Sequence, residues 1–228
     1  MGYSTFLLDL DHTLLDSDRS EILAFDYTMR SAGINDPDTY VDVYRTINRE
    51  LWARVEQGEL RPQEVRTLRF ERLVEQKKIK ADPLQMAEDF VEGLGSNGSL
   101  YPGARDVLGQ LSETARLALV TNGLSEVQRA RIKRLDIEQY FDSIIISAEI
   151  GAAKPGTKIF DIVFSELGSP PRNEVLMVGD SLSSDIRGGQ KYGIATCWYN
   201  PKRRQLDIDL EPKYEISDLY ELLKFVGL

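Results

Sequence analysis

Hydrophobic and polar residues follow two different periodicities along this chain of 228 residues. Between about residues 17 and 96, apolar side chains recur every three or four positions, which is the spacing of one helix face. Proline suits the first turn of a helix, glycine suits its end, and four such amphipathic helices can form a small bundle. The predicted helices run from the cap region Asp16-Ser17 to Gly33, from about Val41 through Val55 to a stop near Gly58, from Pro62 onwards, and from Asp82-Pro83 to Gly95.

The rest of the chain contains short, continuous apolar runs, which are typical of strands buried on both faces. They lie at residues 5–10, 117–120, 144–146, 175–178 and 195–199, with helices predicted at 125–135, 158–167 and 184–192. Strands that alternate with helices predict an α/β fold, a Rossmann-like parallel sheet with helices on both faces. The first strand belongs to this sheet, so the helical bundle is an insertion. We therefore expect a core domain of residues 1–16 and 97–228 and an inserted four-helix domain of residues 17–96.

Composition and charge narrow the possible partners. The chain is 42% hydrophobic and 29% charged, which fits a folded globular protein. Its net charge of −9 argues against nucleic acid as a partner, because phosphate backbones require clustered positive charge. The first apolar stretch is interrupted by Asp9, so no export signal and no membrane partner are expected, and a cytoplasmic location is. The one cysteine, Cys197, lies in an apolar run and is interpreted as a buried structural thiol.

The first predicted strand runs directly into two carboxylates, Asp9 and Asp11. Residues two apart in a strand lie on the same side of the pleat, about 7 Å apart along the chain. Two buried carboxylates repel each other and lose their hydration, so a bound cation would stabilise them. Hard oxygen ligands favour Mg²⁺. The alternative is a strand that ends in a solvated acidic turn.

Polar residues also follow the other predicted strands. Open α/β sheets bind ligands at the carboxyl ends of their strands, and right-handed crossovers bring these ends to one edge. Thr121 and Asn122 end the second strand, Lys154 follows the third, and Asp180 and Asp185 follow the fourth. Each residue alone has an ordinary explanation, such as a helix cap or an exposed lysine. Their occurrence together in this order indicates phosphoryl transfer.

This ordered set resembles the four motifs of the haloacid dehalogenase superfamily over nearly the whole chain, and the inserted helices resemble the small cap of its subfamily I. The matching residues are Asp9, Asp11 and Thr13 in motif one, Thr121 in motif two, Lys154 in motif three, and Asp180 and Asp185 in motif four. The resemblance implies a Mg²⁺-dependent phosphomonoester hydrolase that acts on a small phosphorylated metabolite.

The resemblance also implies roles for the residues at the strand ends. Asp9 would be the nucleophile that becomes a phosphoaspartate, and Asp11 the general acid and base. Thr121, Asn122 and the nearby backbone would hold the phosphoryl oxygens. An acid at position 11 favours a phosphatase over a dehalogenase, which needs no acid there.

The remaining motif residues would manage charge. Lys154 would neutralise charge that develops on the phosphoryl group. The Mg²⁺ ligands would be the Asp9 carboxylate, the Asp11 main-chain carbonyl and the Asp180 carboxylate. Asp185 would orient Lys154 or a metal-bound water without binding the metal itself.

The nature of the substrate follows from two further segments. Residues 121–128 and 195–200 resemble the housekeeping nucleotide phosphatases of this superfamily, which dephosphorylate pyrimidine and non-standard nucleoside monophosphates. A 5'-nucleotidase, present as a monomer or a weak homodimer, is therefore expected. Three alternatives remain open: a sugar phosphate phosphatase of the acylneuraminate-9-phosphate type, a phosphosugar mutase, and an inactive binding module built on the same fold.

Four residues of the inserted helices are candidates for contact with the leaving group: Tyr27, Arg45, Arg49 and Trp52. The alternative interpretation is that these side chains simply pack in the core or lie in solvent. His12 is expected to face a loop. The basic segment 200–204 is either a simple connection or an aid to the capture of anionic substrate.

Overall fold

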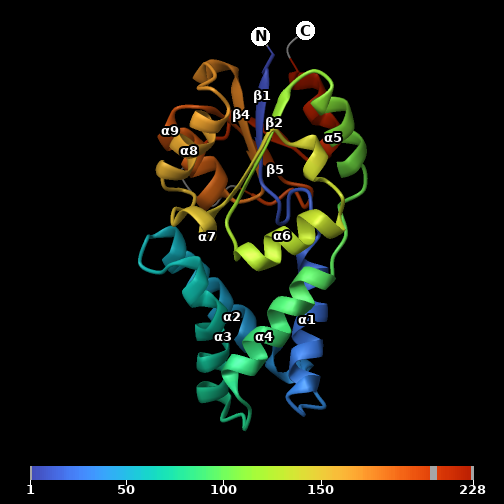
Figure 1. Cartoon of the computed structure of the whole chain (residues 1–228), viewed down its shortest axis with the longest axis vertical. Coiled ribbons are helices and arrows are strands. Elements are labelled where there is room, and N and C mark those ends of the chain that lie inside the picture. Colours follow the sequence, from blue (N-terminus) through green and yellow to red (C-terminus); the bar gives the residue numbers. More distant parts are fainter. Residues whose placement is uncertain (1, 206–209, 227–228) are drawn as a thin grey trace.

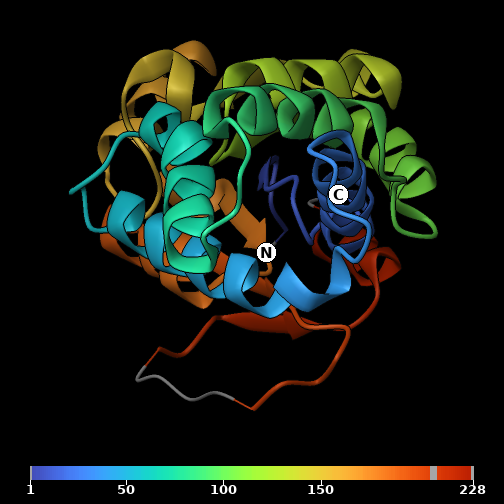
Figure 2. The same ribbon diagram turned by 90° about the horizontal axis from the view of Figure 1, so that it is seen from below.

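The computed structural model describes residues 2–205 and 210–226 and has two parts (Figure 1). A sheet with its flanking helices forms one part, with both ends of the chain on its far side. The four inserted helices form the other part, at the opposite end of the sheet. Figure 2, seen from below, shows these helices arranged around that end of the sheet.

The sheet has six strands in the order β3-β2-β1-β4-β5-β6, and every neighbouring pair is parallel. The strands are β1 (Thr5–Leu8), β2 (Arg116–Thr121), β3 (Ser143–Ile146), β4 (Val175–Gly179), β5 (Ala195–Tyr199) and β6 (Tyr214–Ile216). The five predicted strands and the parallel α/β architecture are confirmed. Because β1 lies between β2 and β4, three of the strand ends with polar residues are direct neighbours.

Alternate residues of the central strand enter different apolar layers. Phe6 and Leu8 pack with α5 (Ala104–Ser112) and with the 3₁₀ turn η4 (Leu219–Phe225). Leu7 packs on the other face with α8 (Lys158–Glu166) and α9 (Arg187–Tyr192). Both faces of β1 are therefore buried, which explains its continuous apolar run.

Several shorter elements connect the strands. They are α6 (Ser125–Arg134), α7 (Ser147–Ile150), the 3₁₀ turns η1 (Glu138–Tyr140) and η2 (Arg172–Glu174), and the π-helical turn η3 (Leu182–Ile186). The helix predicted at 184–192 is thus divided between η3 and α9. Of the described elements, α5, α7, β6, η1, η2 and η4 were not predicted. All except α5 have seven residues or fewer, which is too short for a clear periodicity. The helix α5 buries Ala104, Val107, Leu108 and Leu111 at helical spacing and was overlooked.

All four predicted helices of the insertion are confirmed, as α1 (Ser17–Ser31), α2 (Asp38–Glu56), α3 (Pro62–Lys77) and α4 (Pro83–Ser96). An aromatic cluster forms their core: the rings of Phe25 and Tyr44 lie 4.5 Å apart, those of Tyr44 and Phe90 5.5 Å, and those of Phe70 and Phe90 5.3 Å. None of the helices in residues 2–205 and 210–226 combines the length and the apolar character needed to span a bilayer.

One large apolar residue of the first inserted helix lies in solvent. Ile22 of α1 is 48% exposed. The reason is the close packing of α1 on α4, where a Cβ atom at Gly93 would lie only 2.9 Å from the Cβ of Ala24. This contact turns the Ala24 side of α1 inward and leaves Ile22 in solvent.

The two segments that join the insertion to the sheet lie side by side. Tyr101 N donates to Leu14 O at 2.8 Å, and Asp16 N donates to Ser99 O at 2.9 Å. The two segments are therefore joined by backbone hydrogen bonds where they pass between the sheet and the inserted helices. Asp16 also serves as the N-cap of α1. This arrangement supports our proposal that residues 17–96 form a domain apart from residues 1–16 and 97–228.

Candidate functional site

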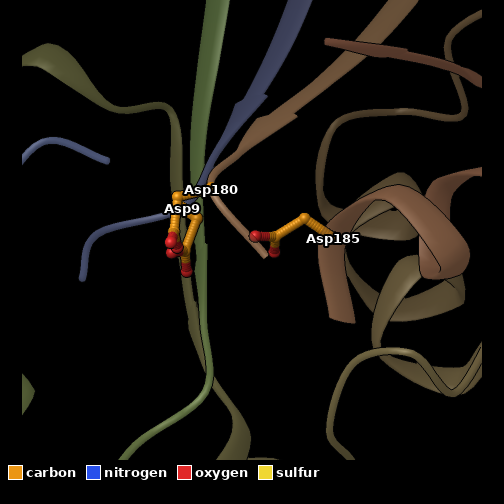
Figure 3. A group of neighbouring side chains, drawn as sticks. All are labelled: Asp9, Asp180 and Asp185. Atoms are coloured by element: carbon orange, nitrogen blue, oxygen red, sulfur yellow. The ribbon is translucent and has the colours of Figure 1, made fainter. Parts of the chain in front are cut away.

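Three carboxylates meet where β1 and β4 end. Asp9 follows β1, Asp180 follows β4, and Asp185 approaches from η3, as Figure 3 shows. One oxygen of each residue lies within 4.8 Å of the other two. Thr13 links the segments that follow β1 and β4, because its Oγ1 accepts a hydrogen bond from Asp180 N at 3.0 Å. The structure thus brings together residues that are 171 and 176 positions apart from Asp9 in the sequence, as predicted.

Lys154 lies between two of these carboxylates and is 1% exposed. Its Nζ is 2.7 Å from Asp9 Oδ1 and 2.6 Å from Asp185 Oδ1, and it donates to Val120 O at 2.6 Å. Burial lowers the pKa of Lys154, but the charges of Asp185 and Asp9 outweigh burial and raise it. Burial raises the pKa of Asp9 well above its usual range, an effect that Lys154 only partly offsets. The raised pKa favours the charged ammonium form of Lys154 beside the candidate nucleophile.

Asp185 is held by its backbone surroundings. Its Oδ2 accepts a hydrogen bond from Ser181 N at 3.0 Å, while Oδ1 contacts Lys154. A Cβ atom at Gly179 would lie 2.1 Å from Asp185 Oδ2, so only glycine leaves room for this carboxylate. Both oxygens of Asp185 are thus engaged, in agreement with the expectation that this residue orients Lys154.

Asp180 is only partly neutralised. Its side chain is 19% exposed, and its Oδ2 lies 3.5 Å from Arg204 Nη2. Arg204 Nη2 and Trp198 Nε1 both donate to the main-chain oxygen of Asp180 at 2.9 Å. Burial, followed by the charge of Asp185, raises the pKa of Asp180 to about 6. The basic segment 200–204 therefore reaches the site through Arg204.

Asp11 lies apart from the three clustered carboxylates. Arg131 Nη1 donates to its Oδ1 at 2.8 Å, Gln128 Nε2 donates to its Oδ2 at 2.6 Å, and Ser17 Oγ also donates to Oδ1. Burial raises the pKa of Asp11, but the charge of Arg131 and these hydrogen bonds bring it below its usual value. The Asp11 carboxylate is therefore stabilised in its ionised form.

Thr121 and Asn122 hold neighbouring parts of the site. Thr121 Oγ1 accepts a hydrogen bond from Gln128 Nε2 at 2.8 Å. Asn122 Nδ2 donates to Lys154 O, and Asn122 Oδ1 accepts from Lys154 N, both at 2.9 Å. The two amide bonds fix the backbone of Lys154. The substrate contacts expected of Thr121 and Asn122 stay predictions.

A cavity of about 270 Å³ lies between the inserted helices and this edge of the sheet. Its sheet side carries Asp9, Asp11 and Asp180, and its helical side includes Asn48, Trp52, Glu56, Arg69 and Phe90. Of the four candidates for contact with the leaving group, Trp52 lines this cavity. Tyr27, Arg45 and Arg49 do not, since they are exposed and the face of α2 that is turned to the cavity carries Asn48, Trp52 and Glu56.

Sequence reasoning did not single out several residues that contact or line the site, among them Gln128, Arg131, Asn48 and Arg69. The only signal for the first two was their position three residues apart on the helix that follows β2. His12 is among the residues that line the cavity and lies in a turn, with its φ angle at 59°. Cys197 is fully buried, as expected, and burial raises the pKa of its thiol to about 12.

The chain is similar to known proteins along nearly its whole length. The chain is 32% identical to pyrimidine 5'-nucleotidase YjjG of Escherichia coli, over 97% of each protein. It is 33% identical to pyrimidine 5'-nucleotidase PynA of Streptococcus pneumoniae, over 98% of this chain and 94% of that protein.

A solved structure agrees with the fold. The HAD-hydrolase YfnB of Bacillus subtilis, described as bound to magnesium, matches all of both chains with a TM-score of 0.91 and 32% identity. The family model for haloacid dehalogenase-like hydrolases matches residues 6–199 of this chain. The chain belongs to the haloacid dehalogenase-like hydrolase family.

Proposed function

We propose that this protein is a Mg²⁺-dependent phosphomonoester hydrolase that acts through a phosphoaspartate on a nucleoside 5'-monophosphate. One observation carries the proposal: the buried carboxylate of Asp9 lies 2.7 Å from Lys154 Nζ and within 4.8 Å of the Asp180 cluster. The proposal is supported because a candidate nucleophile, a buried cation and a second acidic group lie together at one edge of the sheet. The pyrimidine 5'-nucleotidases among its relatives support a nucleotide substrate.

In the first step, an Asp9 oxygen attacks phosphorus while the bond between phosphorus and the leaving oxygen breaks. The leaving alkoxide takes a proton from Asp11. In the second step, Asp11 accepts a proton from water, whose oxygen attacks the phosphoaspartate and releases inorganic phosphate and free Asp9. Lys154 offsets the repulsion between the attacking carboxylate and the anionic phosphate throughout.

The ion pair between Asp11 and Arg131 affects which of the two reaction steps Asp11 is ready for. It favours the ionised form of Asp11, which is the form that accepts the proton from water. Proton donation to the alkoxide requires that this ion pair weaken when substrate binds. Ser17 and Arg131 therefore control when Asp11 is available as an acid.

The acidic cluster fits a divalent cation. Asp9, Asp180 and Asp185 bring three carboxylates around one lysine, and the raised pKa values of Asp9 and Asp180 reflect this excess of negative charge in a buried place. Both oxygens of Asp185 are engaged by Lys154 and Ser181, which leaves Asp9 and Asp180 to hold the ion, together with the Asp11 carbonyl. Bound Mg²⁺ would supply electrostatic stabilisation of the transferring oxygens.

We also propose that the protein works in the cytoplasm as a monomer or a weak homodimer, on small molecules and not on nucleic acid. The single free and fully buried thiol of Cys197 supports a reducing compartment, and the net charge of −9 disfavours nucleic acid. Light scattering after size exclusion at several protein concentrations tests the oligomeric state.

The function is tested by phosphate release from UMP, with Mg²⁺ or with EDTA, by the wild type and by Asp9→Asn. We expect release only from the wild type with Mg²⁺. Asp26→Asn is a matched control, because Asp26 is an exposed partner of Arg30 on α1. Full activity of Asp9→Asn would remove the nucleophile from the proposal. A need for a bisphosphate activator would indicate a mutase, and preference for an acylneuraminate 9-phosphate would indicate the sugar phosphate alternative.

A further inference from the structure

Arg69 of α3 is a buried cation that pairs with no carboxylate in the described part of the chain. It is 3% exposed and lines the cavity. Its Nε donates to Val65 O at 3.1 Å, and its Nη1 donates to the hydroxyl of Tyr44 at 3.3 Å. Within residues 2–205 and 210–226, no carboxylate oxygen lies within 4.0 Å of its guanidinium. Buried charges are normally paired, so this guanidinium is built to meet a group that the protein itself does not supply.

A second polar residue on the helical side of the cavity, Asn48, has one side-chain atom without a hydrogen-bond partner among the described residues. Asn48 Nδ2 donates to Glu21 Oε1 at 2.8 Å, which fixes the orientation of the amide. In the part of the chain that the structure describes, Asn48 Oδ1 is the only buried side-chain oxygen or nitrogen without a hydrogen-bond partner. Buried acceptors in folded proteins are normally paired, so this one indicates a donor that arrives with a ligand.

The two groups belong to one structural unit. Tyr44, which accepts the hydrogen bond from Arg69, lies one turn before Asn48 on α2. Phe90 lies beneath the guanidinium, with 5.2 Å from Arg69 Cζ to its ring centre. Trp52, one turn beyond Asn48, lines the same cavity. The wall thus offers a cationic donor, a neutral acceptor and aromatic surface.

We infer that Arg69 and Asn48 select the leaving group of the substrate by binding a ring carbonyl and the adjacent ring N–H. This inference rests on the proposed phosphomonoesterase activity at Asp9. A carbonyl accepts from Arg69, and a ring N–H donates to Asn48 Oδ1, while the flat ring packs against Trp52. Uracil, thymine and guanine carry such an edge. Cytosine and adenine at neutral pH do not.

The experiment compares UMP, CMP and p-nitrophenyl phosphate as substrates of the wild type, Arg69→Met, Arg69→Lys and Asn48→Leu. p-Nitrophenyl phosphate carries no ring N–H and no carbonyl, so its turnover reports on Asp9 chemistry alone. Arg72→Met is the matched control, because Arg72 lies on the same helix and is 38% exposed. Binding of UMP and CMP to Asp9→Asn, alone and combined with each variant, is measured by calorimetry without turnover.

We expect the wild type to prefer UMP over CMP in kcat/KM by about tenfold or more. Arg69→Met lowers kcat/KM for UMP by about tenfold to a hundredfold and changes p-nitrophenyl phosphate by less than about threefold. Asn48→Leu brings the UMP and CMP values together. Arg69→Lys, which keeps the charge and most of the packing, retains part of the preference, and Arg72→Met changes nothing.

Equal use of UMP and CMP by the wild type would overturn the inference, as would equal loss of UMP and p-nitrophenyl phosphate turnover in folded Arg69→Met or Arg69→Lys. Absence of turnover of both UMP and p-nitrophenyl phosphate in the wild type with Mg²⁺ would instead refute the proposed function. In that case, preferential binding of UMP over CMP to Asp9→Asn, lost when Arg69→Met is added, still decides the base site.

Discussion

Arg131 donates a hydrogen bond to Asp11 Oδ1 at 2.8 Å, and the same guanidinium contacts the first and the last of the four inserted helices. Its Nη2 donates to Ser20 Oγ on α1 and its Nε to Leu94 O on α4, each at 3.1 Å. One buried side chain of α6 therefore links the candidate acid to the position of the inserted helices. A shift of α1 or α4 relative to α6 changes the surroundings of Asp11.

Replacement of Arg131 by Met removes the charge that lowers the pKa of Asp11. The pKa of Asp11 then rises, so the acidic limb of the pH–activity profile moves to higher pH. We expect kcat to fall by about tenfold to a hundredfold, because the acid is no longer held in position. Initial rates between pH 4.5 and 8.5 measure both effects. Arg129→Met is the control: it removes an exposed ion pair with Glu149, and its pH–activity profile is expected to match that of the wild type. An unchanged acidic limb in Arg131→Met would contradict the role of Arg131.

The metal-free protein becomes less stable as the pH rises through the range in which Asp180 titrates. The pKa of Asp180 is about 6 in the folded protein and 3.8 in the absence of such surroundings. The folded state thus binds this proton more tightly than the unfolded state does. The contribution of Asp180 to the free energy of unfolding is therefore largest below pH 4 and is lost as the pH rises past 6. Asp180 alone lowers the free energy of unfolding by about 3 kcal/mol across this window.

Urea unfolding in EDTA at pH values from 4 to 7.5 measures this loss. Mg²⁺ at pH 7 is expected to restore stability, because a divalent ion offsets the charge that the proton offset at low pH. Asp180→Asn removes the part of the pH dependence that Asp180 carries and weakens the response to Mg²⁺. A wild-type stability in EDTA that rises steadily from pH 4 to 7.5 would show that these carboxylates are not under electrostatic stress.

Substitution of Gly179 by Ala displaces Asp185. A Cβ atom at this position would lie 2.1 Å from Asp185 Oδ2, so the carboxylate must leave Lys154 or the strand must shift. We expect the free energy of unfolding to fall by about 2–4 kcal/mol and activity to be nearly lost. Gly109→Ala on α5 is the matched control, since it meets only Tyr140 at 3.9 Å and is expected to gain up to about 1 kcal/mol. Wild-type activity of Gly179→Ala would mean that the position of Asp185 is unimportant.

Cys197 reports on unfolding. Its thiol is fully buried and has a pKa of about 12, so thiolate is scarce and reagents have no access. Labelling with Ellman's reagent at pH 8 is expected to be about a thousandfold slower in the native protein than in guanidinium chloride. Cys197→Ala gives the background signal. Fast labelling of the native protein would place the thiol at the surface.

The predictions from sequence succeeded where local pattern and connectivity carry the information. Leu7 enters one apolar layer while Phe6 and Leu8 enter the other, so β1 is apolar throughout and is recognised without a structure. Parallel strands joined by right-handed crossovers place their carboxyl ends at one edge. Asp9, Lys154 and Asp180 were therefore expected to meet, although 171 positions separate the first from the last.

The sequence by itself thus determined the α/β architecture, the four inserted helices and the charged centre of the site. The tertiary structure alone decided which side chains surround that centre. Asn48 and Arg69 line the cavity, whereas Arg45 and Arg49 lie in solvent, and Arg131 reaches Asp11 across 120 positions. The physical reason is that these contacts depend on how each helix is rotated and how the inserted helices dock on the sheet, and no periodicity within one helix encodes either quantity.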